Sequence, residues 1–240
     1  MNLFQLLGFG DQGWGGVFLL ALLLTVVLTL TALAVGAVFG SMVAAAKLSK
    51  SRTLRVLGDA YTTLFRGIPE LLIIYVFYFG GSTLVTAIGQ FFGADGFISM
   101  PPFLVGALAV GLISGSYQAE VYRAAVLAVS RGEIEAARAI GMSNAMLWRR
   151  VLIPQVMRFA LPGIGNVWQL SLKDSALIAV TGLAEVMRTS QIAAGSTHQY
   201  FTFYVVGGVL YLVLTSLSNR VFDRAEARIG RSFRSSLARH

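Results

Sequence analysis

The chain alternates between long runs of apolar residues and short polar segments, and the length of each apolar run predicts a membrane-spanning helix. Residues 12–46 contain no charged side chain. As a helix this run would be about 52 Å long, whereas the hydrocarbon core of a bilayer is about 30 Å thick. We therefore expect an interfacial turn near Trp14 and a first span within residues 18–46.

Four more spans are expected further along the chain, within residues 71–94, 96–119, 161–183 and 199–219. An amphipathic helix at 54–65 precedes the second span, and Pro69 is expected to bend the join between the two. The fifth span opens with aromatic residues, as membrane interfaces favour. The pattern predicts an all-α integral membrane protein with about five transmembrane helices, forming a single transmembrane domain over residues 1–240.

Composition supports a membrane protein and excludes several other classes. Hydrophobic residues make up 56% of the chain and charged residues 12%, and the mean hydropathy is +0.72. Globular domains carry about 25% charged residues, so this chain has too little polar surface to cover a soluble protein of its size. The sequence contains no cysteine, which excludes a disulfide scaffold, and its lack of polar tracts excludes disorder.

The net charge of +8 would suit a nucleic-acid partner, but the basic residues are distributed as in a multi-pass membrane protein. All 19 lysines and arginines except Lys173 and Arg188 fall in three blocks, at 47–66, 123–158 and 220–239. With five spans the blocks lie on one side, and cytoplasmic loops are enriched in Lys and Arg. We therefore expect no nucleic-acid partner, an outer N-terminus, and a basic cytoplasmic tail at 220–240 that meets anionic membrane lipid.

The polar segment at 131–158 is too long and too charged for a simple connection between two spans. Its first part can form two short helices separated by Gly141, a residue that tolerates the backbone turn at which a helix ends. Ser143 or Asn144 can cap the second helix, and Pro154 is expected to stop or kink the helical stretch around it. On physical arguments alone, the segment is either a cytoplasmic docking surface or an interfacial helix on the lipid headgroups.

Part of this segment resembles a known motif. Three elements follow the spacing of the EAA loop of ABC-importer permeases: Glu135-Ala136-Ala137, Gly141 and Val151-Leu152-Ile153-Pro154. That motif ends in Ile-x-Leu-Pro. This chain has Val151 in place of the isoleucine and Ile153 in place of the leucine, and both are conservative departures. Further stretches are similar to permease subunits of histidine, lysine/arginine and opine uptake systems, at 60–72, 158–177 and 196–201. The resemblance extends over most of residues 40–222.

The resemblance implies a type I ABC importer permease fold in a bacterial inner membrane. On this resemblance the chain forms half of a translocation path for polar or basic amino acids or opines. The implied partners are an ABC ATPase dimer, a second permease, unlike rather than identical, and a periplasmic solute-binding protein. The chain has no GxxxxGK[ST] loop, so ATP and Mg²⁺ belong to the ATPase, and we expect this chain to bind no cofactor and to be no enzyme.

Within the motif, the resemblance assigns ATPase coupling to Glu135, Ala136, Ala137, Gly141 and Pro154. It implies a contact through Glu135 and the face formed by the two alanines, with Gly141 supplying the bend. Small side chains suit such a contact, because a bulky side chain would hold the helix out of a packed groove.

A polar sector inside the fourth span is the candidate substrate path or gate. Asn166, Gln169 and Lys173 recur at helical spacing, and Asp174 lies on an adjacent stripe. Ionisable residues are costly to bury within a span, which makes them functional candidates. The sector either contacts a zwitterionic substrate through both of its charges or holds two permeases together as a structural network.

Two other charged pairs also have a structural interpretation. Glu120 and Arg123 are spaced to form a local ion pair at the end of the third span; in the functional alternative Glu120 belongs to a cytoplasmic gate. Arg66 and Glu70 can form an ion pair that braces the bend at Pro69. Both pairs are therefore expected to form within the chain.

Two rival functions stay open on the sequence. An intramembrane hydrolase would pair Ser114 or Ser116 with His198, but His198 is expected in an outer loop at 184–200 and no metal-ligand cluster accompanies it. A self-sufficient secondary transporter would also need intramembrane charge, but the chain has no internal inverted repeat. Within the importer class, the substrate stays open among basic amino acids, histidine, opines and other solutes.

Overall fold

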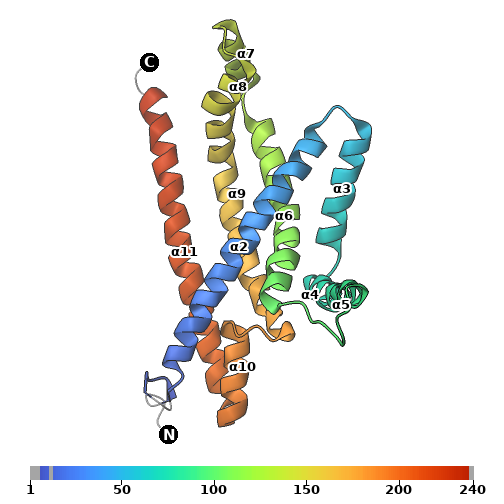
Figure 1. The fold of residues 1–240 in the computed structure, drawn as a ribbon. Coiled ribbons are helices and arrows are strands. Elements are labelled where there is room, and N and C mark those ends of the chain that lie inside the picture. Colours follow the sequence, from blue (N-terminus) through green and yellow to red (C-terminus); the bar gives the residue numbers. More distant parts are fainter. Residues whose placement is uncertain (1–5, 11–12, 238–240) are drawn as a thin grey trace.

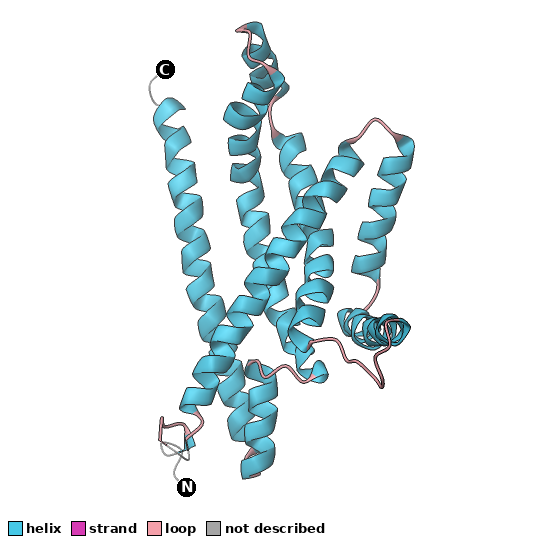
Figure 2. Ribbon diagram, viewed as in Figure 1, coloured by secondary structure: helices cyan, strands magenta, loops and turns pink. Residues whose placement is uncertain are grey.

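The structure is a computed structural model that describes residues 6–10 and 13–237, and every regular element in these residues is a helix (Figure 2). The prediction of an all-α protein is confirmed. The first residues of the predicted outer N-terminus and the last three residues of the predicted tail lie outside the described part of the chain.

The first half of the described chain contains three separate helices and one composite helix. The separate helices are α2 (Gly15–Leu48), α3 (Arg52–Gly67) and α6 (Pro102–Ala128). The composite helix lies between α3 and α6 and consists of α4 (Glu70–Tyr75), the π-helix η1 (Val76–Gly80) and α5 (Gly81–Phe91). Pro69 directly precedes α4, so the predicted bend between the amphipathic helix and the second span is confirmed.

The second half begins with α7 (Arg131–Ala139), which is followed by a long helical run. This run consists of α8 (Asn144–Leu147), the π-helix η2 (Trp148–Leu152), α9 (Ile153–Asp174) and the 3-10 helix η3 (Ser175–Thr181). The last two helices are α10 (Val186–Thr197) and α11 (Tyr200–Leu237).

Four of the described helices are long and apolar enough to cross a membrane: α2, the composite helix Glu70–Phe91, α6 and the Tyr200–Ile229 part of α11. They correspond to the first, second, third and fifth predicted spans. The fourth predicted span is α9 followed by η3, which does not reach the same apolarity. Figure 1 nevertheless shows α9 running alongside α6 and α11, and residues of α9 contact both helices. A helix packed against neighbours on two sides needs fewer apolar residues than one surrounded by lipid.

Two details of the predicted spans were wrong. The third span begins at Pro102 rather than at residue 96, because Pro102 takes the first helical position, where its missing N–H costs no hydrogen bond. The predicted outer loop at 184–200 is largely helix α10, which the Glu185 side chain caps by accepting from two backbone N–H groups. The second span runs in another direction from the rest of the bundle, since Figure 1 shows α4 and α5 nearly end-on while α2, α6, α9 and α11 are seen from the side.

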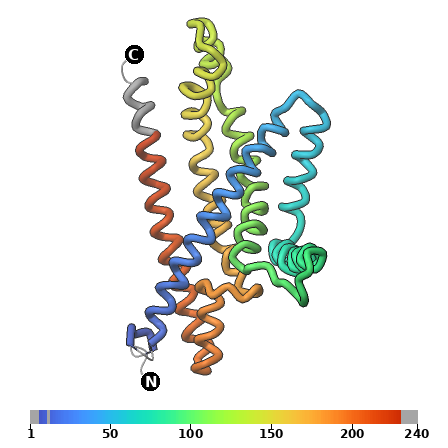
Figure 3. The backbone as a smooth tube through the Cα atoms, viewed as in Figure 1, coloured from blue at the N-terminus to red at the C-terminus, as the bar shows by residue number. Residues whose placement is uncertain are grey.

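The two ends of the bundle differ in charge. The end of α2, the α7–α8 segment and the C-terminal part of α11 lie at one end, which we call the basic end (Figures 1 and 3). The start of α2 and helix α10 lie at the opposite end. This arrangement brings most of the three basic blocks together as predicted, and the assignment of the basic end to the cytoplasm stays a prediction.

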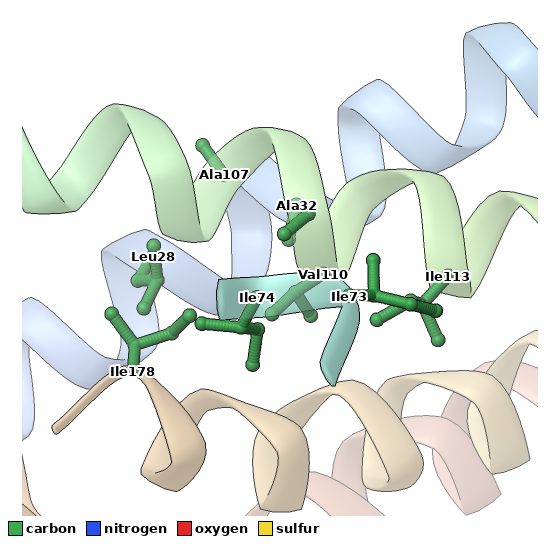
Figure 4. Packing of buried hydrophobic residues seen from close by; sticks show 9 residues of the cluster. Leu28, Ala32, Ile73, Ile74, Ala107, Val110, Ile113 and Ile178 are labelled. Carbon is green, nitrogen blue, oxygen red and sulfur yellow. The ribbon is translucent and has the colours of Figure 1, made fainter. Parts of the chain in front are cut away.

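Close packing between α2 and α6 forms the centre of the molecule. A Cβ atom on Gly40 would lie 2.9 Å from the carbonyl oxygen of Gly115, so only glycine allows the two backbones to approach this closely. Further along these two helices, Leu28, Val110 and Ile178 belong to a buried apolar cluster contributed by α2, α4, α6 and η3 (Figure 4). The cluster fixes the position of η3, and hence of the end of α9, against the other helices.

Candidate functional site

The α7–α8 segment, residues 131–147, projects from the bundle at its basic end (Figure 1), and we call it the tip. Gly141 has a φ of +79°, a left-handed conformation that favours glycine. Its N–H donates to the carbonyl of Arg138 at 2.9 Å, which closes the end of α7. The Ser143 hydroxyl then accepts from the N–H of Met146 at 3.4 Å and caps α8. The predicted helix–glycine–helix arrangement is confirmed, with Ser143 rather than Asn144 as the cap.

The inner side of the tip is fastened to α9. Four buried apolar side chains pack together between α6, α7 and the start of the α8–α9 run: Val129, Ala137, Leu147 and Leu152. The amide of the buried Gln155 donates to the Glu133 carboxylate, which ties α7 to α9. The sequence does not reveal this contact, because the two residues lie on separate helices. These contacts join the tip directly to α9.

The outer side of the tip exposes Glu135, Ala136 and Gly141. Ala137, by contrast, is only 4% exposed and packs inward. The expected contact face of two alanines is therefore corrected to Ala136 alone, because successive residues on a helix point about 100° apart. Ile140 is 75% exposed beside Gly141 and adds an apolar side chain that the sequence analysis missed. An exposed isoleucine within a polar segment is the signal that could have identified it.

Pro154 is exposed at the second position of α9 and does not stop the helix. The π-helical turn η2 directly precedes α9, so the chain stays helical from Asn144 through Asp174. A proline ring clashes with the carbonyl four residues earlier, and the wider π-helical turn relieves this clash. The prediction of a stop or kink at Pro154 is replaced by a local widening of the helix.

Glu120 belongs to a charged network that joins three helices. Its carboxylate accepts from Arg123 Nε at 3.0 Å, which confirms the predicted local ion pair. The other carboxylate oxygen contacts Lys47 Nζ from the last turn of α2. Lys47 also forms an ion pair with Asp59 of α3 at 2.9 Å. The Lys47 side chain is 9% exposed, and the sequence analysis missed its role because its partners lie far away along the chain.

The predicted ion pair between Arg66 and Glu70 does not occur among the described residues. The Arg66 guanidinium instead lies over the ring of Tyr117, 5.2 Å from its centroid. Arg66 is near the end of α3 and Glu70 begins α4, and the extended backbone between the two helices separates their directions. The bend at Pro69 therefore has no bracing salt bridge.

The polar sector of α9 is divided between two environments. Asn166 and Lys173 are exposed, whereas the Gln169 amide donates to the side-chain oxygen of Asn219 on α11. Asp174 is partly buried at the end of α9, where the negative charge of Glu70 repels its carboxylate and Lys173 attracts it. Two carboxylates and one ammonium thus act on each other at the end of α9 that lies away from the basic end.

Glu185 is a buried acidic residue that the sequence analysis did not single out. Its carboxylate accepts from the N–H groups of Met187 and Arg188 at 2.8 and 2.7 Å and from the Tyr211 hydroxyl at 2.8 Å. Burial raises the pKa of Glu185, while these three donors act to lower it. A lone acidic residue just before a helical stretch was the available signal. Its role is to cap α10 and to link it to α11.

The serine–histidine arrangement of a hydrolase is not formed. The Ser114 and Ser116 hydroxyls donate to carbonyls within α6, at 3.0 Å to Gly111 and 2.7 Å to Ile113. His198 is exposed at the C-terminal end of α10. In the described chain no hydrogen bond joins His198 to either serine. The serine hydroxyls satisfy backbone carbonyls within the close α2–α6 packing.

A family model described as the inner membrane component of binding-protein-dependent transport systems matches residues 36–231. The chain belongs to this family. The match covers the tip, the polar sector of α9 and the charged network around Glu120, so each candidate site lies within the permease part of the sequence. The match confirms the resemblance to ABC-importer permeases that the spacing of Glu135, Gly141 and Pro154 indicated. The chain is therefore an inner-membrane ABC-importer permease rather than a hydrolase or a secondary transporter.

Individual relatives of this permease cover almost its whole length. The octopine transport system permease protein of Rhizobium meliloti is 53% identical over 98% of this chain and 99% of its own. The histidine/lysine/arginine/ornithine transport system permease protein of Escherichia coli is 38% identical over 90% of this chain and 94% of its own. A chain in the crystal structure of an amino acid ABC transporter with histidines superposes with a TM-score of 0.74 at 32% identity, over 90% of this chain and 95% of that chain.

Proposed function

We propose that this permease admits cationic amino acids or opines and works with an ABC ATPase dimer, a second, unlike permease and a periplasmic solute-binding protein. The similarity to an octopine permease over nearly the full length of both chains carries this proposal. The lower but still extensive similarity to a histidine/lysine/arginine/ornithine permease supports the same class of substrate. In this account residues 1–240 form one transmembrane domain, and its basic C-terminal tail meets anionic lipid.

The tip supports the proposed coupling to an ATPase. Glu135, Ala136 and Ile140 form an exposed surface with one charged, one small and one large apolar side chain. Such a surface suits insertion into a groove, because a few residues buried in a contact carry most of its binding energy. The Glu133–Gln155 contact then passes a displacement of the tip to α9. ATP and Mg²⁺ bind the ATPase, and this chain binds neither.

The far end of α9 supports the proposed substrate class. The carboxylates of Glu70 and Asp174 attract an ammonium or guanidinium group, and Lys173 attracts a carboxylate. Asn166 and Lys173 lie on an exposed face of α9, available to a translocation path between two permeases. In this proposal the sector holds the charged groups of the substrate during passage, and Gln169 fixes α9 against α11.

Transport by the complete complex tests this proposal. The permease, its purified partners and the binding protein are reconstituted in liposomes, and uptake of labelled L-arginine is measured with competing octopine, L-histidine or L-glutamate. We expect saturable uptake that requires ATP, with competition by octopine and histidine but not by glutamate. Uptake without ATP would contradict the proposed coupling, and preferred uptake of glutamate would contradict the substrate class.

A further inference from the structure

A polar cleft of about 500 Å³ opens between α2, α3 and α6, apart from the polar sector of α9. It is lined by charged groups of both signs, by hydroxyl groups and by one aromatic ring, mainly from Lys47, Asp59, Thr62, Arg66, Tyr117 and Glu120. Lys47 lies in the last turn of α2, so the cleft begins near the basic end of the bundle (Figure 1). Neither Glu70 nor Asp174 lines it.

The floor of the cleft is a set of mutually satisfied charges. Lys47 Nζ contacts Glu120 and also donates to the Thr62 hydroxyl at 2.9 Å. A Cβ atom on Gly58 would lie 2.6 Å from Lys47 Cγ, so the glycine lets α3 pack closely on the lysine stem. A buried cation held by a carboxylate and a hydroxyl is a fixed part of the structure and leaves little capacity for a ligand.

Two charged groups at the rim keep hydrogen-bonding capacity. The Asp59 side chain is 65% exposed, and only one of its oxygens forms the ion pair with Lys47. Arg66 is exposed and forms no ion pair with any described residue. The Arg66 guanidinium lies over the Tyr117 ring, a contact that uses none of its N–H groups as hydrogen-bond donors to a carboxylate.

The order of these two residues along α3 indicates the kind of ligand. Asp59 and Arg66 are separated by seven positions on α3, so they share one face, and their backbone positions lie about 10.5 Å apart along the helix axis. Thr62 and Thr63 lie between them and also line the cleft. An anionic group and a cationic group about two helical turns apart on one face suit a molecule with a carboxylate at one end and a cation at the far end of a flexible chain.

We infer that the cleft binds an α-amino acid with a cationic side chain, with Arg66 on its carboxylate and Asp59 on its side-chain cation. The choice of this ligand class rests on the proposed function, and the site is additional to the polar sector of α9. Its place near the basic end puts it on the side at which an imported substrate leaves the permease.

Equilibrium binding to the assembled complex in nanodiscs, without ATP and with Asp174→Asn in every permease to weaken the polar sector of α9, tests the cleft with three ligands. L-Arginine has both end groups, agmatine lacks the carboxylate, and L-citrulline lacks the side-chain cation. We expect Arg66→Gln to weaken the binding of arginine and of citrulline roughly tenfold and to leave the binding of agmatine unchanged. Asp59→Asn should weaken the binding of arginine and of agmatine to a similar degree and leave the binding of citrulline unchanged. The ligand that each variant still binds normally shows that the variant is folded.

The matched control is Arg52→Gln, which removes the same charge from an exposed position of α3 outside the cleft. It should change the binding of none of the three ligands. If both rim variants bind all three ligands as the wild type does, the inference that the cleft is a binding site is overturned. ATP-driven uptake tests the proposed function separately, so the proposed function would still stand. A wild-type complex that binds none of the ligands and transports no cationic amino acid would overturn both.

Discussion

Replacing Gly141 by aspartate is expected to reduce ATP-driven uptake by about thirtyfold or more, the effect of losing roughly 2 kcal/mol of docking free energy at the tip. Gly141 has a φ of +79°, and a residue with a Cβ atom in this conformation is strained by about 1–2 kcal/mol. The added carboxylate also lies beside exposed Ile140, at the negative end of the α7 dipole. The change affects the outer surface of the tip and not the packed interior of the bundle.

The chain offers a matched control for this variant. Gly93 has a φ of +87°, follows α5 as Gly141 follows α7, and has no atom within 4 Å of an added Cβ. Gly93→Asp therefore introduces the same charge and a similar backbone strain away from the tip. Uptake in reconstituted liposomes and membrane abundance by immunoblot are measured for both variants. Wild-type uptake by Gly141→Asp at normal abundance would contradict the coupling role.

Replacing Asp174 by asparagine is expected to raise the half-saturating concentration of L-arginine about tenfold in the same uptake assay. Asp174 lies within electrostatic reach of Glu70, and the substitution removes one of these two carboxylates from the proposed substrate path while keeping the shape of the side chain. Asp95→Asn, in the exposed segment after α5, removes the same charge away from α9 and should leave the half-saturating concentration unchanged. An unchanged value for Asp174→Asn would remove this residue from the substrate path.

Lys173→Met separates the two interpretations of the polar sector. If Lys173 binds the substrate carboxylate, the variant weakens the apparent affinity for arginine while the amount of co-purified second permease stays constant. If the sector holds two permeases together, the variant lowers that amount and leaves the affinity of the remaining complex intact. Lys173 is exposed on α9, which is compatible with a contact to the substrate or to the second permease.

The sequence predicts the elements that depend on local patterns. Apolar runs identify α2, α6 and α11, and the glycine at 141 between two polar helical stretches identifies the tip. Pro69 and Ser143 act within a few residues of their position, so their roles follow from local rules. These features need no knowledge of the tertiary structure.

The contacts that complete the sites depend on residues far apart in the chain. Lys47 meets Glu120 only after α2, α3 and α6 have packed, and Gln155 meets Glu133 only after α7 has folded back on α9. The sequence also does not reveal that Ala137 points inward, because both alanines of the motif suit either side of the helix. The composite helix at Glu70–Phe91 has the length of a span, but its crosswise direction depends on packing.

Affinity purification of the tagged permease from its native membranes in mild detergent tests the central claim most directly, with the co-purifying chains identified by mass spectrometry. The account predicts an ABC ATPase and a second, unlike permease in near-stoichiometric amounts, with the ATPase lost from Gly141→Asp and retained by Gly93→Asp. Recovery of the wild-type permease without any ATPase would contradict it.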